Sequence, residues 1–155
     1  IRYVKKEYNV LIGERTAEEI KISVATVSKT GRNEAIEIRG RDLVSGLPKT
    51  LRITSAETRE ALAEVTQAIV ERVKYVLEHT PPELAADIID RGIVMTGGGA
   101  MVNGLDKVIQ EATGITTYLA ENPLECVALG TGKALEDIEK LQDSLTSLQK
   151  ASAAK

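Results

Sequence analysis

Three successive glycines lie in a segment whose pattern is typical of a strand, a turn and a helix. The apolar run 93–95 precedes Gly97, Gly98 and Gly99, and apolar residues recur at helical spacing from Val108 onward. Glycines carry no Cβ, so a ligand can lie against the backbone, and amides at the start of the next helix can face a phosphate or a ribose. The segment predicts a nucleotide site, although the same glycines would also suit an empty turn with positive φ.

Neither of the two commonest phosphate-binding motifs fits this chain. A Rossmann motif starting at Gly97 requires glycine or alanine at the position of Val102. A P-loop ending at Gly132-Lys133 fails both at its first glycine and at the residue after the lysine. The glycine turn therefore indicates a different type of nucleotide site.

Charged residues also recur on one face of a predicted helix over 14–24. Glu14, Glu18 and Lys21 follow one another at steps of four and three, which places them on the same side of that helix. Spacing alone favours a solvated face held by side-chain ion pairs. The single histidine, His79, has no metal-ligand spacing around it, so we assign no catalytic residue and no metal ligand.

Composition excludes some classes of partner. The 155 residues include no Phe or Trp, and Lys and Arg are interspersed with Asp and Glu to a net charge of −3. Such a chain lacks the aromatic platforms and the basic footprint expected of a nucleic-acid-binding protein. We therefore expect no nucleic-acid partner.

Periodicity predicts the elements that would position these residues. Alternation around Ile36–Arg39 and Leu51–Thr54 predicts an antiparallel pair of strands. A long helix is predicted from a cap at Ser55 to His79, where Pro81-Pro82 stops it, and a short helix follows to about 90. Apolar residues from Leu124 to Leu148 recur at mostly helical steps. The pattern is that of an α/β chain that begins within a helix.

Five segments resemble bacterial actins of the MreB family, in the family's order and over nearly the whole chain: 11–21, 39–43, 81–88, 93–100 and 130–135. The resemblance is to the carboxy-terminal half only, and it implies the actin-like (ribonuclease H-like, ASKHA) fold. It predicts an α/β core subdomain with a small α+β inserted subdomain. The implied divisions are 1–12 as the truncated start of core subdomain IIA, 13–60 as the small subdomain IIB, 61–140 as IIA with the adenosine motif, and 141–155 as a helical extension and frayed tail.

The same resemblance gives the charged helix face a role. ATP or ADP would be held, with Mg in the complete protein, by two sets of adenosine contacts: Glu18, Glu19, Ile20 and Lys21 on the helix, and Gly97, Gly98, Gly99 and Ala100 at the turn. Glu18 could accept hydrogen bonds from ribose hydroxyls, and Lys21 could border the base. The phosphate- and metal-binding parts of the family precede this region, so we expect the chain to be inactive alone.

The implied function is that of an ATP-dependent, filament-forming cytoskeletal protein that controls rod cell shape and cell-wall synthesis. Its partners would be other protomers, the missing amino-terminal half, a RodZ-like membrane protein and the cell-wall elongation machinery. Its location would be the cytoplasm, at the inner face of the membrane in the complete protein. The alternatives are another actin-fold ATPase, a sugar-kinase-like enzyme, or an interaction domain whose glycine turn is empty.

Overall fold

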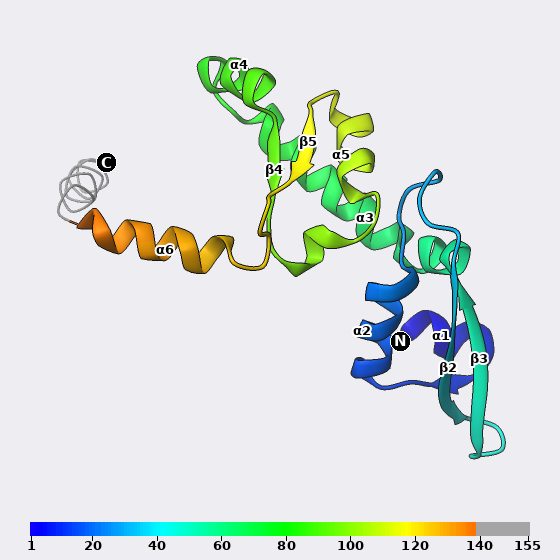
Figure 1. Cartoon of the computed structure of the whole chain (residues 1–155). Coiled ribbons are helices and arrows are strands. Elements are labelled where there is room, and N and C mark those ends of the chain that lie inside the picture. Colours follow the sequence, from blue (N-terminus) through cyan, green and yellow to red (C-terminus); the bar gives the residue numbers. More distant parts are fainter. Residues whose placement is uncertain (139–155) are drawn as a thin grey trace, which may run out of the picture.

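The computed structural model describes residues 1–138, which form two lobes joined by one long helix (Figure 1). The first lobe contains α1 (Arg2–Tyr8), β1 (Val10–Leu11), α2 (Glu14–Val24), β2 (Ala35–Asp42) and β3 (Pro48–Thr54). The long helix is α3 (Ser55–Glu78). The second lobe contains α4 (Pro82–Arg91), β4 (Ile93–Met95), the 3₁₀ helix η1 (Gly98–Met101), α5 (Leu105–Thr113), β5 (Thr117–Leu119) and α6 (Cys126–Glu136).

The first lobe is built on an antiparallel sheet in the order β1-β2-β3. Ile38 lies opposite Leu51, and Ile36 lies opposite Ile53, so the apolar members of the two alternating patterns share one face. The antiparallel pair expected from the sequence is confirmed. Strand β1 adds a third, short strand that the sequence did not indicate.

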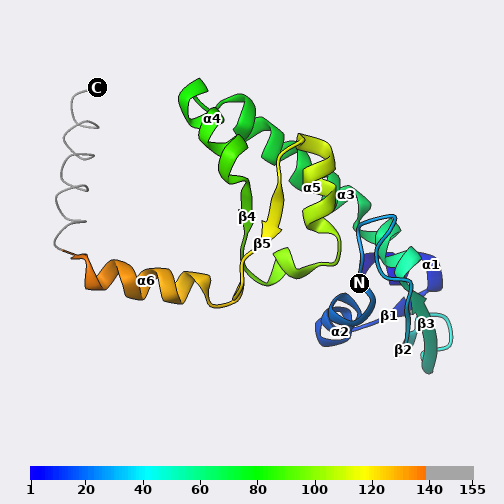
Figure 2. The same ribbon diagram turned by 45° about the horizontal axis from the view of Figure 1, so that its top comes forward.

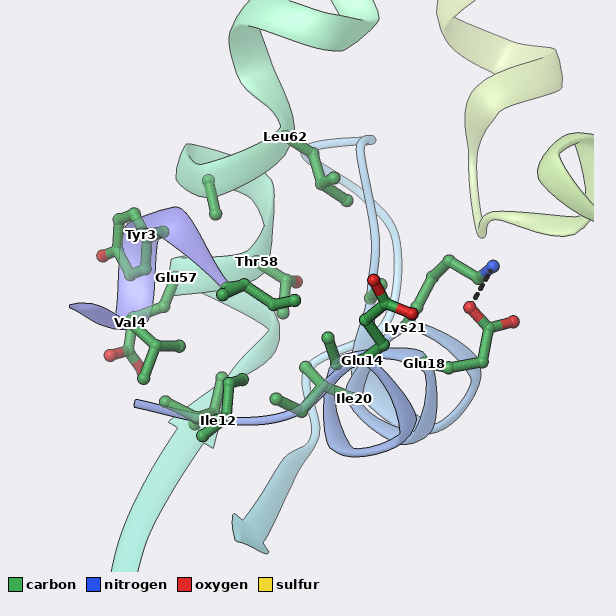
Figure 3. A pocket seen from close by; sticks show the side chains of 15 residues that line it. Tyr3, Val4, Ile12, Glu14, Glu18, Ile20, Lys21, Glu57, Thr58 and Leu62 are labelled. Carbon is green, nitrogen blue, oxygen red and sulfur yellow. Dashed lines mark ion pairs between the residues drawn. The ribbon is translucent and has the colours of Figure 1, made fainter. Parts of the chain in front are cut away.

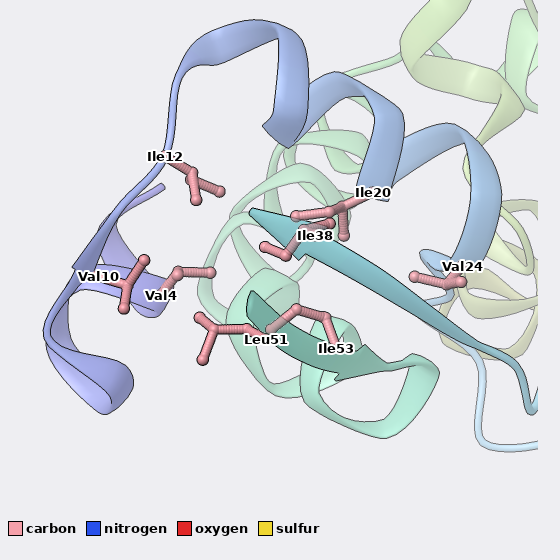
Figure 4. Packing of buried hydrophobic residues seen from close by; sticks show 8 residues of the cluster. All are labelled: Val4, Val10, Ile12, Ile20, Val24, Ile38, Leu51 and Ile53. Carbon is pink, nitrogen blue, oxygen red and sulfur yellow. The ribbon is translucent and has the colours of Figure 1, made fainter. Parts of the chain in front are cut away.

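Eight buried aliphatic side chains form the core of this lobe (Figure 4): Val4, Val10, Ile12, Ile20, Val24, Ile38, Leu51 and Ile53. They come from both helices and all three strands, and they cover the inner face of the sheet. Residues before 13 thus pack in the same cluster as helix α2 and the sheet. The subdomain boundaries expected from the sequence have no matching break in this packing and stay predictions.

Helix α3 occupies nearly the predicted span but is capped one residue earlier than expected. The amide of Glu57 donates to the hydroxyl oxygen of Thr54, and the Glu57 carboxylate accepts from the Thr54 amide at 2.8 Å, which completes a capping box. The hydroxyl of Ser55 instead donates to the carbonyl of Val24 at 2.8 Å. Because α3 contributes buried Thr58 to one lobe and buried Val70 to the other, it joins them as one continuous rod.

The second lobe has a parallel sheet of two strands, β4 and β5, with α5 packed against α3 (Figure 2). Its core contains Val70, Met95, Leu105 and Ile109. The predicted strand at 93–95 and the helix after the glycine turn are confirmed. Among the described residues, β4 pairs along one edge only, and its Val94 is half exposed.

Helix α6 leads away from β4 and β5 (Figures 1 and 2). It includes both Gly130 and Gly132, although glycine is unfavourable inside a helix. Val127 and Leu135 on this helix are 74% and 62% exposed, so its apolar side chains pack little on the rest of the described chain. The predicted extension over 141–155 lies outside the described residues.

Glu57 connects the start of α3 to α1. Its carboxylate accepts hydrogen bonds from the hydroxyls of Tyr8 and Thr54 as well as from the Thr54 amide. Partial burial raises the pKa of Glu57, but these hydrogen bonds to the charged form outweigh burial and lower the pKa overall. The charged carboxylate therefore stabilises the folded state.

Replacing this carboxylate should remove part of the pH dependence of stability. A depressed folded-state pKa contributes stability above the unfolded pKa, and that contribution is lost as pH falls through the folded pKa. We expect Glu57→Gln to lower the free energy of unfolding by about 1 kcal/mol near pH 7 and by much less near pH 3. Urea unfolding at both pH values measures this, with Glu64→Gln on the exposed face of the same helix as control. A loss that is the same at both pH values would contradict the assignment.

Candidate nucleotide site

A cavity of about 280 Å³ lies between helix α2 and the glycine turn. Its walls come from α2, the α2–β2 loop, the turn after β4 and the segment before α6. The lining residues are Glu18, Lys21, Ile22, Arg32, Gly98, Met101, Val102, Asn103 and Leu124. Two segments far apart in the sequence, each of which could contact a nucleotide, thus face one another across one space.

Glu18 and Lys21, both on α2, form an ion pair at the wall of the cavity. Figure 3 shows this pair from a second cavity that it also borders. Lys21 Nζ lies 2.6 Å from Glu18 Oε2. The Lys21 side chain is 37% exposed and the Glu18 side chain is 54% exposed. An ion pair this exposed contributes little to stability, so rearranging it around a ligand costs little. The carboxylate offers acceptors to hydroxyl groups, and the ammonium group offers donors.

The glycine turn forms the facing wall. Gly97 has φ of +83°, a conformation that favours glycine, and its amide donates to the carbonyl of Pro123 at 2.7 Å. Gly98 then begins η1 and lines the cavity. The nearest atom to a Cβ built on Gly98 would be Leu124 Cδ2 at 3.4 Å, so the space in front of this glycine is open to a ligand.

Of the eight residues predicted to contact a nucleotide, the structure brings Glu18, Lys21 and Gly98 together on the cavity wall. Glu19 is exposed outside the lining, and Ile20 is 7% exposed in the first core. The remaining three, Gly97, Gly99 and Ala100, belong to the turn but not to the lining, and Ala100 packs against the second core. Contact between these residues and a nucleotide stays a prediction.

Six lining residues had not been singled out from the sequence: Ile22, Arg32, Met101, Val102, Asn103 and Leu124. Met101, Val102 and Asn103 directly follow the glycine turn, so extending the motif by three positions would have found them. Arg32 and Leu124 come from loops, and nothing in their local pattern places them here. Their position depends on how the two lobes meet.

The lobes meet at a junction formed by residues 26–32 and Asn103-Gly104. Thr26 and Asn103 form an isolated parallel bridge, and the amide of Val27 donates to the Asn103 carbonyl at 3.0 Å. The side-chain oxygen of Asn103 accepts from Thr26 Oγ1 at 2.9 Å and from the amide of Arg32 at 3.1 Å. This junction fixes the distance between α2 and the glycine turn.

Arg32 connects the junction to the end of α2. Its guanidinium donates to the carbonyls of Ile22 at 2.8 Å and Ser23 at 3.0 Å, which are otherwise free at a helix C-terminus. The positive charge is favourable at this end of a helix dipole. Arg32 is therefore held at the cavity wall by backbone groups.

A larger cavity of about 370 Å³ also borders α2 and lies against α1 and the start of α3 (Figure 3). Glu18 and Lys21 also border it, but the rest of its wall comes from the first lobe and α3, and no residue of the glycine turn lines it. Of these two cavities, the smaller one is therefore bordered by both predicted sets of contact residues.

Residues 1–143 match the family described as MreB/Mbl protein. This chain belongs to the MreB/Mbl family. It is 57% identical over 141 residues to the cell shape-determining protein Mbl of Bacillus subtilis, covering 91% of this chain and 42% of that protein. It is 48% identical over 139 residues to the cell shape-determining protein MreB of Escherichia coli, covering 90% of this chain and 40% of that protein.

The crystal structure of MreB5 of Spiroplasma citri bound to ADP has the same fold as this MreB/Mbl chain. The TM-score is 0.85 at 39% identity, over 92% of this chain and 43% of the other. The actin-like α/β fold expected from the sequence is thereby confirmed. The chain spans less than half the length of the relatives that it matches.

The junction gives a direct test of the site's architecture in this MreB/Mbl chain. A Cβ on Gly31 would overlap Thr26 Oγ1 and crowd Asn103 Oδ1, whereas a Cβ on Gly99 would meet nothing within 4 Å. We expect Gly31→Ala to lower the free energy of unfolding by about 1–3 kcal/mol and Gly99→Ala to change it by no more than about 0.5 kcal/mol. Urea unfolding followed by circular dichroism measures both. Equal losses would show that the junction is not closely packed.

Proposed function

We propose that this chain supplies the adenosine side of an ATP cleft in an actin-like, filament-forming protein that controls rod cell shape and cell-wall synthesis. The observation that supports this is the cavity that Glu18 and Lys21 of α2 share with Gly98 of the glycine turn. The MreB5 relative was solved with ADP bound. Membership of the MreB/Mbl family favours this function over a sugar-kinase-like enzyme.

In this proposal each cavity residue contacts a different part of the nucleoside. The Glu18 carboxylate accepts from ribose hydroxyls, and the Lys21 ammonium group borders the base. The backbone of Gly98 lies against the nucleoside because no side chain intervenes. Apolar side chains of Ile22, Met101 and Leu124 cover the faces of the base, as in most small-molecule sites.

ATP hydrolysis would need groups beyond those on the adenosine side of the cleft. Phosphoryl transfer depends on a metal ion, phosphate clamps and a positioned water. Within residues 1–138, no group of three or more His, Cys, Asp or Glu side chains is placed to hold a metal ion, and we assign no metal ligand there. We propose that the phosphates and magnesium are held by the amino-terminal half of the complete protein.

Exposed apolar surface supports the proposal that this chain binds a large partner such as the amino-terminal half. A groove of about 660 Å³ between α3, α4 and β4 is lined almost entirely by apolar side chains, including Val65, Ile69 and Val76, each of which is at least 39% exposed. It adjoins β4, whose second edge is unpaired within residues 1–138. Exposed apolar patches of this extent usually mark interfaces. The amino-terminal half is the partner we propose for them.

The remaining partners follow from the family's proposed role. They are other protomers in a filament, a RodZ-like membrane protein and the cell-wall elongation machinery, with the complete protein in the cytoplasm at the inner face of the membrane. The curated relatives are named cell shape-determining proteins. No helix among residues 1–138 is long and apolar enough to cross a bilayer.

Nucleotide binding can be tested with a pair of glycine variants that introduce the same side chain. Gly98 lines the cavity, whereas Gly13 is exposed at the start of α2, outside the cavity, and a Cβ there would meet nothing within 4 Å. We expect Gly98→Arg to fill the cavity and weaken binding of a fluorescent ATP analogue at least about tenfold, and Gly13→Arg to leave it within about threefold of wild type. Fluorescence titration of the whole chain measures both. Equal affinities for wild type and Gly98→Arg would show that the glycine turn is empty.

Hydrolysis can be tested by complementation. The chain would be mixed with the part of Bacillus subtilis Mbl that it does not match, which is the remainder of a protein 42% covered here. We expect phosphate release from ATP in the mixture, none above background from either piece alone, and none when the chain carries Gly98→Arg. Absence of turnover from a mixture that forms a stable complex would contradict the divided cleft.

A further inference from the structure

We propose that Asn103 determines the base specificity of this site, because its side-chain amide donates a hydrogen bond to N1 of adenine. This inference rests on the proposed nucleotide-binding function and identifies which nucleotide the cavity selects. Asn103 lines the cavity and lies outside the glycine turn itself.

Two neighbours fix the orientation of the Asn103 amide. The backbone amide of Arg32 can only donate, so the atom that it meets at 3.1 Å is the side-chain oxygen. The hydroxyl of Thr26 donates to the same oxygen at 2.9 Å and is fully buried. Turning the amide over would place the NH₂ group against the Arg32 amide, with two donors facing each other. The oxygen therefore stays directed at residues 26–32.

The NH₂ group of Asn103 has no acceptor within residues 1–138, and Asn103 is only partly buried. Its carbonyl is also occupied, because it accepts from the Val27 amide at 3.0 Å. The polar atom that Asn103 has available for a molecule in the cavity is therefore the nitrogen of its side chain, which donates and does not accept.

Asn103 faces the C-terminal end of α2, and this position indicates which part of a nucleotide it meets. Glu18 and Ile22 are separated by one turn, about 6 Å along the helix axis. Arg32 is bonded to the carbonyl of Ile22 and also to Asn103, so Asn103 lies near the C-terminal end of α2, beyond Glu18. With the ribose at Glu18, the edge of the base farthest from the sugar points towards Asn103. In a purine this is the edge that carries N1.

At that edge the two common purines have opposite chemistry. N1 of adenine accepts a hydrogen bond, whereas N1 of guanine carries a hydrogen and donates. A fixed donor pairs with adenine and leaves two donors opposed with guanine. Because Thr26 and Arg32 hold the side-chain oxygen, the amide cannot turn to accept from guanine. A site with a fixed polar group rejects a ligand that leaves this group unpaired.

The experiment uses Asn103→Asp in the whole chain. Aspartate keeps an acceptor for Thr26 and Arg32 but replaces the donor with a second acceptor. Dissociation constants for ATP, GTP and 1-deaza-ATP, which lacks the N1 acceptor, would be measured by displacement of a fluorescent ATP analogue. We expect wild type to prefer ATP to both other nucleotides by about tenfold, and the variant to lose that preference over each of them. We compare ratios of affinities because the added negative charge weakens the binding of all three nucleotides alike.

Thr26→Val provides a second variant with an unchanged Asn103. It removes one of the two donors that fix the amide but leaves the NH₂ group in place. We expect the preference for ATP over GTP to fall, because the amide is less constrained and can turn to accept from guanine. Any loosening of the junction weakens the binding of both nucleotides and cancels in this ratio. Circular dichroism confirms that each variant is folded.

Three outcomes would overturn the inference. They are an unchanged ATP-to-GTP ratio in Asn103→Asp, equal affinities of wild type for ATP and 1-deaza-ATP, and an unchanged ATP-to-GTP ratio in Thr26→Val. Failure of wild type to bind any nucleotide is a separate result, because it would overturn the proposed function itself.

Discussion

The hydrogen bonds between Thr26 and Asn103 hold together the two segments on which the candidate site depends. Thr26 belongs to the first lobe, Asn103 follows the glycine turn in the second, and the cavity lies between their elements. The same buried threonine receives support from α3, because its amide donates to Thr58 Oγ1 at 3.3 Å. Polar groups buried here are costly unless they are paired. Pairing them across the lobes therefore makes the relative position of α2 and the turn a requirement of folding.

Much of the fold could be predicted from the sequence because local periodicity determines it. The apolar spacing in α2 and α3 and the alternation in β2 and β3 are properties of neighbouring residues, and these elements form where expected. Strand β5 was missed because its sequence Thr-Tyr-Leu is not a continuous apolar run, unlike the equally short β4. The cap of α3 was placed one residue late because both Thr54 and Ser55 suit that position, and only the contact of Ser55 with Val24 separates them.

The site was harder to predict than the fold. Glu18, Lys21 and Gly98 could be proposed because the charged spacing and the glycines are visible locally and match a family. Arg32 and Leu124 could not, since loops bring them to the cavity and their side chains have no motif of their own. Glu19 and Ile20 share a helix with the lining residues but point elsewhere, since successive helical residues face different directions. A contiguous motif therefore overstates the number of residues that line the cavity.

Helix α3 has a mechanical consequence. Its 24 residues make a rod about 36 Å long; Ser55 and Thr58 at its start bond to the end of α2, and Val70 and Val73 farther along pack in the second core. A long helix without a kink curves only gently, so α3 keeps the two lobes at a nearly constant separation. The β2–β3 turn at 43–47 lies at the far end of the first lobe (Figure 1). Any rotation of the first lobe about the start of α3 would therefore move this turn farther than it moves the residues at the cavity.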